Sequence, residues 1–507
     1  MNTLNDVGPG LPPCSRASAR RIAAFLFSAT LLCALPDDTL LEAVRHSSHD
    51  TLQSLIRRHA NVNATQPDGD TPLHWAVWQD DLTAAEMLIK AGANVKAANR
   101  YGVTPLSLAC TNGNAAIVQL LLKAGAGPNT ALPGGETALM TAARTGKADA
   151  IKALLAAGAT VDAKEPVHGQ TALMWAAAEG NVEAVEALIA AGADIHARLG
   201  SGFTPLLFAV REGRIAVVRA LLKSGADVNE TFQPAKNAVR KSKGPRPGTS
   251  ALILAVENAH YELAASLLDA GADPNAHGPG FTALHAVSWV RKSGGGDNDP
   301  APEGSGNMTS IEIVRALVRH GAAVNARMTK KINVGLTSLN TTGATPFFLA
   351  ARTADAELMR ELARLGADPL LKNADNSTPL MAAAGLGTRS PGEDAGTESE
   401  VLEAMQVALD LGADLNAVDD NGETAMHASA YKNLPLAVKF LADKGADIKV
   451  WNRKNKYGWT PLRIAEGYRF GNFKPSFETV AMFHKVMTAA GVPLTDSPEL
   501  AAAGGNR

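Results

Sequence analysis

The chain has 507 residues and a formal net charge of −2 at pH 7. Because it is nearly neutral, the chain as a whole produces no field that would favour nucleic acid or an acidic membrane as its partner. Aromatic residues make up 5% of the chain, and its apolar residues are mostly Ala, Leu and Val. This composition favours many small, closely packed helices over one thick hydrophobic core.

The N-terminal region carries the features of an export signal. Arginines precede an uncharged apolar run over 22–35, and the small residue Ala34 lies near its end. This order is typical of a secretory leader, which we assign to residues 1–36. We therefore expect an exported bacterial protein, periplasmic or extracellular, without a stable membrane span once the leader is removed, because the run is too short to predict one. The alternatives are a cytoplasmic protein and one anchored by an uncleaved N-terminus.

Three cysteines limit the redox chemistry of the chain. Cys14 and Cys33 lie within the leader, so the mature chain keeps only Cys110. A single thiol cannot form an internal disulfide, and the chain has no Cys-x-x-Cys pair for zinc or redox chemistry. We expect Cys110 to be a packed core residue.

After the leader, one pattern of about 33 residues recurs along the chain. Thr71 can cap a first helix with its hydroxyl group, and Pro72 fits the first turn of that helix. Gly92 can end a second helix in a left-handed turn. The anchor positions of the copies are Thr71, Thr104, Thr137, Thr171, Thr204, Ser250, Thr282, Thr345, Thr378, Thr424 and Thr460.

This pattern, G-x-T-P-L-H-x-A followed by x-x-V-x-x-L-L-x-x-G-A-x-x-N, resembles the ankyrin repeat over roughly residues 37–493. The resemblance implies an all-α ankyrin-repeat solenoid, in which helix-turn-helix units are joined by β-hairpins or loops. One unit cannot bury its apolar faces alone, so stacked units must share a continuous core. The predicted domains are the leader, an N-terminal capping repeat (37–67), a repeat array (68–456), an aromatic C-terminal capping repeat (457–493) and a disordered tail (494–507).

Three repeats exceed the period and therefore contain insertions. The insertions expected between two helices are acidic, with Glu398 and Glu400 in the last of them, whereas those expected in hairpins are basic. The predicted insertions lie near 232–247, 291–309, 327–342 and 387–400. The basic residues predicted to form a rim at the hairpin tips are Lys236, Arg240, Lys241, Lys243, Arg246, Lys330, Lys331, Arg453 and Lys454.

By the resemblance, side chains seven places after an anchor and one place before it face the concave groove, where ankyrin proteins typically bind partners. Trp, Tyr and Arg most often dominate binding energy at interfaces. Trp175, four places after its anchor, is expected instead to pack between repeats. The residues predicted on the groove are Trp78, Arg144, Phe203, Arg211, Phe281, Trp289, Arg352, Tyr431 and Trp459.

The last unit is rich in aromatic residues, which include Trp451, Tyr457, Phe470 and Phe483. One interpretation is an aromatic cap, because an end repeat has no neighbour to bury its core face. The other is a second binding patch.

Three histidines, His74, His285 and His427, occupy the same repeat position. In ankyrin repeats this ring typically hydrogen-bonds to the neighbouring hairpin, so we interpret all three as structural. The chain has no zinc-protease motif, phosphate loop or calcium-loop pattern. We therefore predict no enzyme, no catalytic residue, no cofactor and no metal site.

Together these features predict a monomeric, non-enzymatic protein–protein interaction scaffold. Its unknown partner would bind the groove and the hairpin tips, and the basic rim would favour acidic sequences. The alternative is a binder of an anionic polymer, either nucleic acid or acidic polysaccharide, through the basic hairpin insertions; nucleic acid is not favoured, given the net charge.

Overall fold

The computed structural model describes residues 38–236, 244–292, 302–333, 337–471 and 474–492. The chain divides into two compact units, residues 1–247 and 248–507. Each unit consists of helix pairs joined by loops, and the described residues contain only isolated β-bridges. The predicted fold class, an all-α solenoid of repeated helix pairs, is confirmed.

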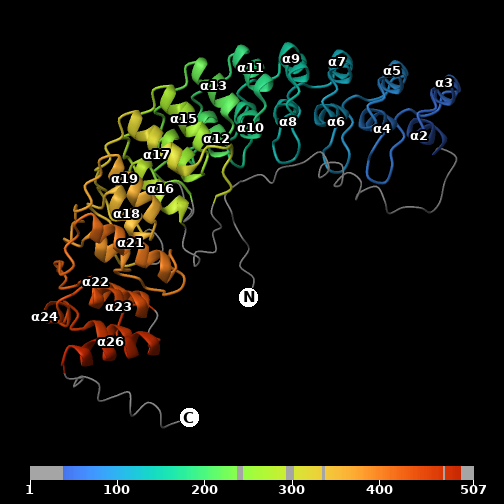
Figure 1. The fold of residues 1–507 in the computed structure, drawn as a ribbon. Helices are drawn as coiled ribbons and strands as arrows, with labels where there is room; N and C mark the ends of the chain where they lie inside the picture. Colours follow the sequence, from blue (N-terminus) through green and yellow to red (C-terminus); the bar gives the residue numbers. More distant parts are fainter. Residues whose placement is uncertain (1–37, 237–243, 293–301, 334–336, 472–473, 493–507) are drawn as a thin grey trace, which may run out of the picture. The chain divides into compact units, whose positions relative to one another are not determined.

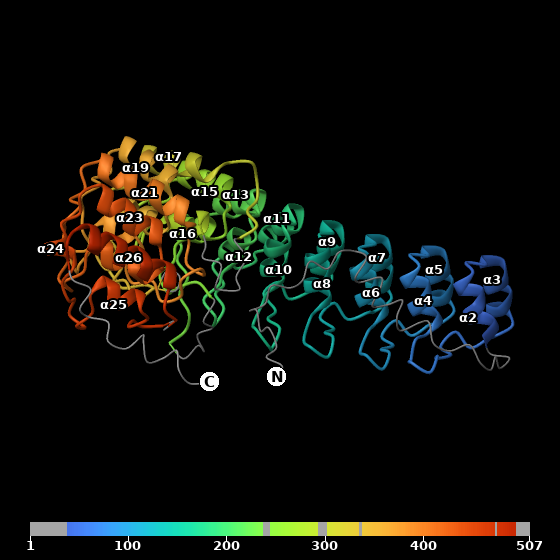
Figure 2. The same cartoon turned by 60° about the horizontal axis from the view of Figure 1, so that its bottom comes forward.

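In unit 1, the first helices of successive repeats stack on one another and the second helices form a parallel row beside them (Figure 1). The loops that connect the repeats project from one edge of the unit, as Figure 2 shows below α4, α6 and α8. The helices of unit 1 are α2 (Asp38–Arg45), α3 (His49–Arg57), α4 (Pro72–Trp78), α5 (Leu82–Lys90), α6 (Pro105–Asn112), α7 (Ala115–Lys123), α8 (Ala138–Thr145), α9 (Ala148–Ala156), α10 (Ala172–Glu179), α11 (Val182–Ala190), α12 (Pro205–Arg211) and α13 (Ile215–Lys223).

Unit 2 repeats this two-row arrangement, with the short helix α24 in the loop after α23. Its described helices are α14 (Ala251–Glu257), α15 (Tyr261–Asp269), α16 (Ala283–Arg291), α17 (Ser310–Arg319), α18 (Pro346–Arg352), α19 (Ala356–Arg364), α20 (Pro379–Ala383), α21 (Glu398–Asp410), α22 (Ala425–Lys432), α23 (Pro435–Asp443), α24 (Ile448–Trp451), α25 (Pro461–Ala465) and α26 (Phe477–Ala489).

The predicted helix signals act as expected. The Thr71 hydroxyl accepts a hydrogen bond from the backbone N–H of His74, which would otherwise lack a partner in the first turn. Pro72 begins α4, where its missing N–H costs nothing. Gly92 follows α5 with φ 91°, a left-handed conformation that glycine adopts readily. Cys110 is fully buried, as predicted for a core thiol.

The three equivalent histidines join each repeat to the next. In each ring Nδ1 accepts a hydrogen bond from the backbone N–H of its own anchor threonine, so Nε2 carries the proton. Nε2 then donates to a carbonyl oxygen of the following loop. These donor–acceptor distances are 3.1 Å for His74 to Val103, 3.2 Å for His285 to Ala344 and 3.1 Å for His427 to Arg453. The predicted structural role of these histidines is confirmed.

The aromatic residues of the last repeat divide into two groups. Trp451 and Phe483 are buried, with ring centroids 5.9 Å apart, and they cover the core at the end of unit 2. Tyr457, Tyr468 and Phe470 remain 40–46% exposed, so the interpretation as an end cap does not describe them. Within the ranges that the structure describes, no helix is long and apolar enough to cross a membrane.

Replacing both buried unit 2 histidines by methionine should flatten the pH dependence of stability. Burial lowers the pKa of His285 and His427 to about 4, from an ordinary value of 6.5. Between these values the unfolded chain binds protons that the folded chain does not, so stability falls as pH decreases. This loss amounts to about 2 kcal/mol per ring between pH 7 and pH 5. The wild-type protein should lose more unfolding free energy on acidification than the His285→Met, His427→Met variant.

Methionine suits this test because Met381 occupies the same repeat position, and its sulfur accepts from the anchor N–H at 3.4 Å. Urea unfolding at pH 7 and pH 5 measures the difference. His59→Asn, at an exposed histidine with φ 60°, is the control and should keep the wild-type profile. Equal pH dependence in all three proteins would contradict the assignment of neutral, buried rings.

Candidate partner-binding surface

The two predicted groove positions of a repeat contact each other. A side chain at the end of a helix tilts toward the helix N-terminus, so the residue seven places after an anchor reaches the residue just before it. The Arg144 guanidinium lies 3.2 Å from the Glu136 carboxylate, and that of Arg211 lies 4.9 Å from the Phe203 ring centroid. Two further pairs, Phe281–Trp289 and Glu423–Tyr431, show the same geometry in unit 2. Most of these positions are predicted from the sequence, whereas their pairing is not.

In unit 1, Arg144 forms the centre of a mixed polar and aromatic surface. Its guanidinium carbon lies 5.7 Å from the centroid of the Trp175 ring, which belongs to the next repeat. The Thr141 hydroxyl donates to the same Glu136 oxygen at 2.7 Å, which fixes the carboxylate beside the arginine. The indole N–H of Trp175 is buried and has no acceptor among the described residues. This surface therefore combines an arginine–carboxylate pair with an aromatic ring.

A second arginine repeats this chemistry at α12. The Arg211 guanidinium lies over Phe203 and Phe208, and its Nε donates to the Glu212 carboxylate at 2.8 Å. Stacking on aromatic faces stabilises a guanidinium while leaving its outer edge accessible. The side chains of Arg144 and Arg211 remain 22% and 21% exposed.

The N-terminal end of this surface is aromatic. Trp78 is 37% exposed and contacts Trp75 edge-on, with ring centroids 5.6 Å apart. The Arg45 guanidinium lies 4.2 Å from the Trp75 ring centroid. We call Trp78, Arg144, Trp175 and Arg211 together the unit 1 face.

Four of the residues predicted to line the groove are buried within the protein. Phe203, Phe281, Arg352 and Tyr431 are all buried, at 9%, 1%, 3% and 5% exposure, so the prediction that these side chains line an open groove is wrong. The two phenylalanines pack against neighbouring rings. The Tyr431 hydroxyl donates to Glu423 at 2.7 Å, and burial raises the pKa of that carboxyl group to about 7. Trp289 and Trp459 are half-buried.

Arg352 is buried because the chain's own insertion covers it. Asp394, in the loop between α20 and α21, accepts a hydrogen bond from Arg352 at 2.6 Å and another from the Thr388 hydroxyl at 2.7 Å. Lys432 donates to the carbonyl oxygen of Ala395. Burial alone would raise the pKa of Asp394, but the Arg352 and Lys432 cations hold it below its ordinary value. Burial lowers the pKa of Lys432 to about 8.

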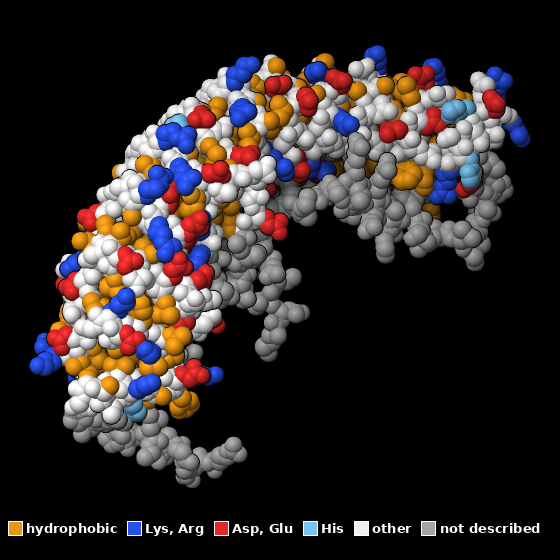
Figure 3. Space-filling view, in the orientation of Figure 1, with side chains coloured by type: hydrophobic (Ala, Val, Ile, Leu, Met, Phe, Trp, Pro, Cys, Tyr) orange, Lys and Arg blue, Asp and Glu red, His pale blue; other side chains and the backbone are white. Residues whose placement is uncertain are grey.

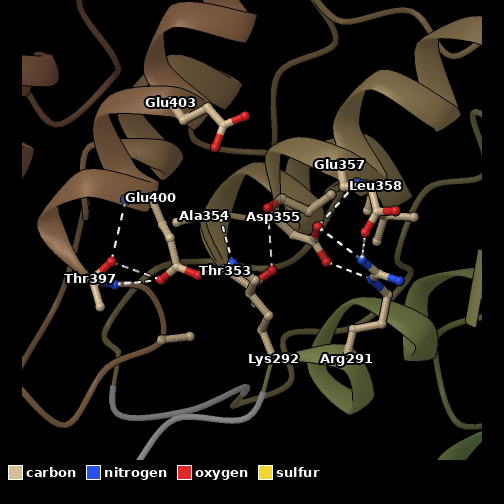
Figure 4. A network of polar contacts seen from close by, with 12 residues as sticks. Arg291, Lys292, Thr353, Ala354, Asp355, Glu357, Leu358, Thr397, Glu400 and Glu403 are labelled. Atoms are coloured by element: carbon tan, nitrogen blue, oxygen red, sulfur yellow. Dashed lines mark hydrogen bonds and ion pairs between the residues drawn. The ribbon is translucent and has the colours of Figure 1, made fainter.

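A second polar network, shown in Figure 4, joins α16, α19 and α21. Arg291 donates to Asp355 at 2.6 Å and to Glu357 at 2.7 Å. Lys292 pairs with Glu400 at 2.6 Å, and this bond lowers the pKa of that carboxyl group to about 2. Glu400 also forms a capping box with Thr397 in the first turn of α21. The acids predicted to lie in a loop, Glu398 and Glu400, therefore belong to a helix.

Several residues of the predicted basic rim form hydrogen bonds within the chain itself. Arg240, Lys241 and Lys243 lie outside the described residues, Arg246 is half-buried, and Lys236 and Lys454 are exposed. The remaining rim residues donate to backbone carbonyl groups: Lys330 to Gly278, Lys331 to Ser338 and Arg453 to Lys449.

On the face that Figure 3 displays, cations and acids are interspersed over the outer helices of each unit, without a large field of one sign. Among the described residues, no group of three or more His, Cys, Asp and Glu side chains could hold a metal ion. The unit 1 face, built from aromatic rings and arginines, has the chemistry of a binding surface.

Comparison with protein-family models finds ankyrin repeats along the chain. A model of three ankyrin-repeat copies matches residues 40–132, 124–198 and 396–473, and a single-repeat model matches 201–231 and 248–278.

Neurogenic locus notch homolog protein 1 is a curated relative. The Danio rerio protein is 31% identical over 216 residues, and the Homo sapiens protein is 33% identical over 220 residues; each alignment covers 38% of this chain and 8% of the relative. A fowlpox virus ankyrin repeat protein is 44% identical over 50 residues, which cover 10% of this chain and 12% of the viral protein. The chain thus spans only a small part of the length of each relative.

Removing the carboxylate of Asp394 should destabilise unit 2 strongly. Asp394→Asn leaves the buried cations Arg352 and Lys432 without their counter-charge, so we expect a loss of about 3–5 kcal/mol in unfolding free energy. Glu403→Gln is a matched control, because the Arg360–Glu403 pair has the same 2.6 Å separation but side chains that are 56% and 53% exposed. It should cost less than about 1 kcal/mol. Urea unfolding measures both, and equal losses would contradict the buried role of Asp394.

Proposed function

Because the chain belongs to the ankyrin-repeat family, we propose that it is a non-enzymatic interaction scaffold whose unit 1 face binds an acidic, non-helical segment of a partner protein. Ankyrin repeats generally mediate protein–protein interaction. One observation within the chain supports an acidic ligand: Arg352, seven places after its anchor, receives the Asp394 carboxylate from a non-helical segment. Arg144 and Arg211 occupy the same repeat position but are partly exposed.

The unit 2 insertion therefore serves as an internal example of what this position binds. A segment of turns and bends supplies one carboxylate to the arginine, and the carbonyl group of its next residue accepts from Lys432, eight places after the anchor Thr424. In unit 1 a partner segment would supply the carboxylates to Arg144 and Arg211, whose side chains are partly exposed. Trp78 would provide the exposed aromatic contact, a residue type that often dominates binding energy.

The structure gives less support to a binder of anionic polymers. Binding of that kind depends on several cations that remain available to phosphate or sulfate groups. Lys330, Lys331 and Arg453 instead direct donors to carbonyl groups of the chain itself.

Selection of peptides from a displayed random library, with the full chain as bait, tests the proposed function. We expect selected peptides rich in Asp and Glu. Arg144→Met with Arg211→Met should weaken their binding by about 30-fold, equivalent to about 2 kcal/mol lost at interface arginines. Isothermal titration calorimetry with the selected peptides measures the effect.

Lys123→Met with Lys223→Met is the control, because both lysines are exposed at the ends of second helices and the charge change is the same. The control should bind with wild-type affinity. Peptides without acidic residues, or equal affinity for the two double variants, would argue against the unit 1 face as the acidic binding site.

Export of the protein is a separate proposal, which rests on the arginines and the apolar run before Pro36. A fusion of residues 1–40 to a bacterial alkaline phosphatase, which folds to its active form only outside the cytoplasm, should be active in a bacterial host. Changing Leu31 and Leu32 to Arg interrupts the apolar run and should abolish the activity at equal expression. An inactive wild-type fusion would show that these residues do not direct export.

A further inference from the structure

The last repeat carries an exposed aromatic patch that the proposed function does not use. Three of its rings form a mutual cluster, with centroid separations of 5.2 Å for Tyr457–Trp459, 5.0 Å for Tyr457–Phe470 and 5.2 Å for Trp459–Phe470. Tyr457 is 44% exposed and Phe470 is 46% exposed, which is unusual for large apolar side chains. Tyr468 is also exposed, with the Arg463 guanidinium 3.8 Å from its ring centroid.

The backbone beneath the patch is held firmly. The side-chain oxygen of Asn455 accepts from the N–H groups of Tyr457 at 3.0 Å and Trp459 at 3.1 Å, which fixes the turn that carries both rings. Between Tyr468 and Phe470, Arg469 points inward and is buried; it donates to the Tyr431 carbonyl at 2.8 Å. The rings are therefore preorganised on the surface.

The same segment concentrates positive charge. Between residues 449 and 474 the chain has a single acidic residue, Glu466, which is buried and paired with Arg463 at 3.1 Å. Lys454 and Lys456 are exposed, and the Lys456 ammonium group lies 5.1 Å from the Tyr457 ring centroid. The basic residues of the segment are Lys449, Arg453, Lys454, Lys456, Arg463, Arg469 and Lys474. This concentration contrasts with the whole chain, whose net charge is −2.

We propose that this terminal patch, made of Lys454, Lys456, Tyr457, Trp459, Tyr468 and Phe470, binds the surface of an anionic lipid membrane. Trp and Tyr rings favour the membrane–water interface, where the ring contacts acyl chains and its polar group contacts water and headgroups. Flanking lysines are attracted to anionic headgroups. An aromatic patch with adjacent cations therefore matches both the acyl-chain boundary and the charged headgroups of an anionic lipid surface.

The ring geometry favours lipid over single-stranded nucleic acid. Bases bind by stacking on open aromatic faces. Here Phe470 meets Tyr457 at an interplanar angle of 85° and Trp459 at 61°, so the rings contact one another edge to face, and Lys456 lies over Tyr457. Insertion into an interface needs exposed apolar edges, which the cluster retains.

Vesicle co-sedimentation of the full chain tests this proposal. The probes are vesicles of phosphatidylcholine alone and vesicles of phosphatidylcholine and phosphatidylglycerol in equal parts. Binding to the neutral vesicles reports any contribution of the apolar run over 22–35, and the increase on adding phosphatidylglycerol reports the patch. We expect this increase to fall with rising salt, because screening weakens the attraction of the lysines.

Lys454→Glu with Lys456→Glu should weaken binding to the anionic vesicles by about 30-fold or more, because each neutralised cation contributes about fivefold and the new carboxylates add repulsion. Phe470→Ser should weaken it in a way that salt does not change, because the lost contact is apolar. Lys123→Glu with Lys223→Glu makes the same charge change on unit 1 and should leave binding unaltered. Circular dichroism verifies that each variant is folded.

The proposal is overturned if the full chain binds both kinds of vesicle equally, or if the two charge-reversed proteins lose binding equally. It is also overturned if the chain ignores anionic vesicles but binds single-stranded oligo(dT) in fluorescence anisotropy, with loss of that binding in Lys454→Glu, Lys456→Glu. That result would assign the patch to nucleic acid.

Discussion

The fold depends on the hydrogen bonds at the start of each first helix. In most repeats an anchor hydroxyl accepts from the first turn of its own helix, and where the residue three places later is histidine, its ring also reaches the next loop. A helix of seven or eight residues is too short to be stable alone. The hydrogen-bonding groups at its ends therefore need local partners, and its apolar face must be buried by neighbouring helices. Repetition of this one device produces the two-row stack in each unit.

Once the stack exists, the same repeat position can serve two purposes. The arginine seven places after an anchor is partly exposed at Arg144 but fully enclosed at Arg352. The difference comes from an inserted loop, which brings Asp394 onto the arginine and turns a surface position into core. Unit 2 thus fills with its own chain the kind of position that unit 1 leaves accessible.

The two units therefore carry surfaces of different chemistry. The unit 1 face combines arginines with adjacent carboxylates and aromatic rings, which suits a ligand that supplies both charge and hydrogen-bond acceptors. The terminal patch of unit 2 has exposed rings beside lysines, and the segment 449–474 that carries it contains a single acid, Glu466, which is buried. These are separable hypotheses, because the residues that carry them belong to different compact units.

The sequence by itself determined the family, the all-α fold and the role of the three histidines, because the Thr, Pro, His and Gly signals act within one repeat or between adjacent ones. It also located the positions from which Arg144 and Arg211 project. Only the tertiary structure decided which of those positions stay accessible: Arg352 and Tyr431 share their repeat position but are buried. The physical reason is that the path of an inserted loop depends on contacts such as Asp394 to Arg352, whose partners are separated by 42 residues and follow no period.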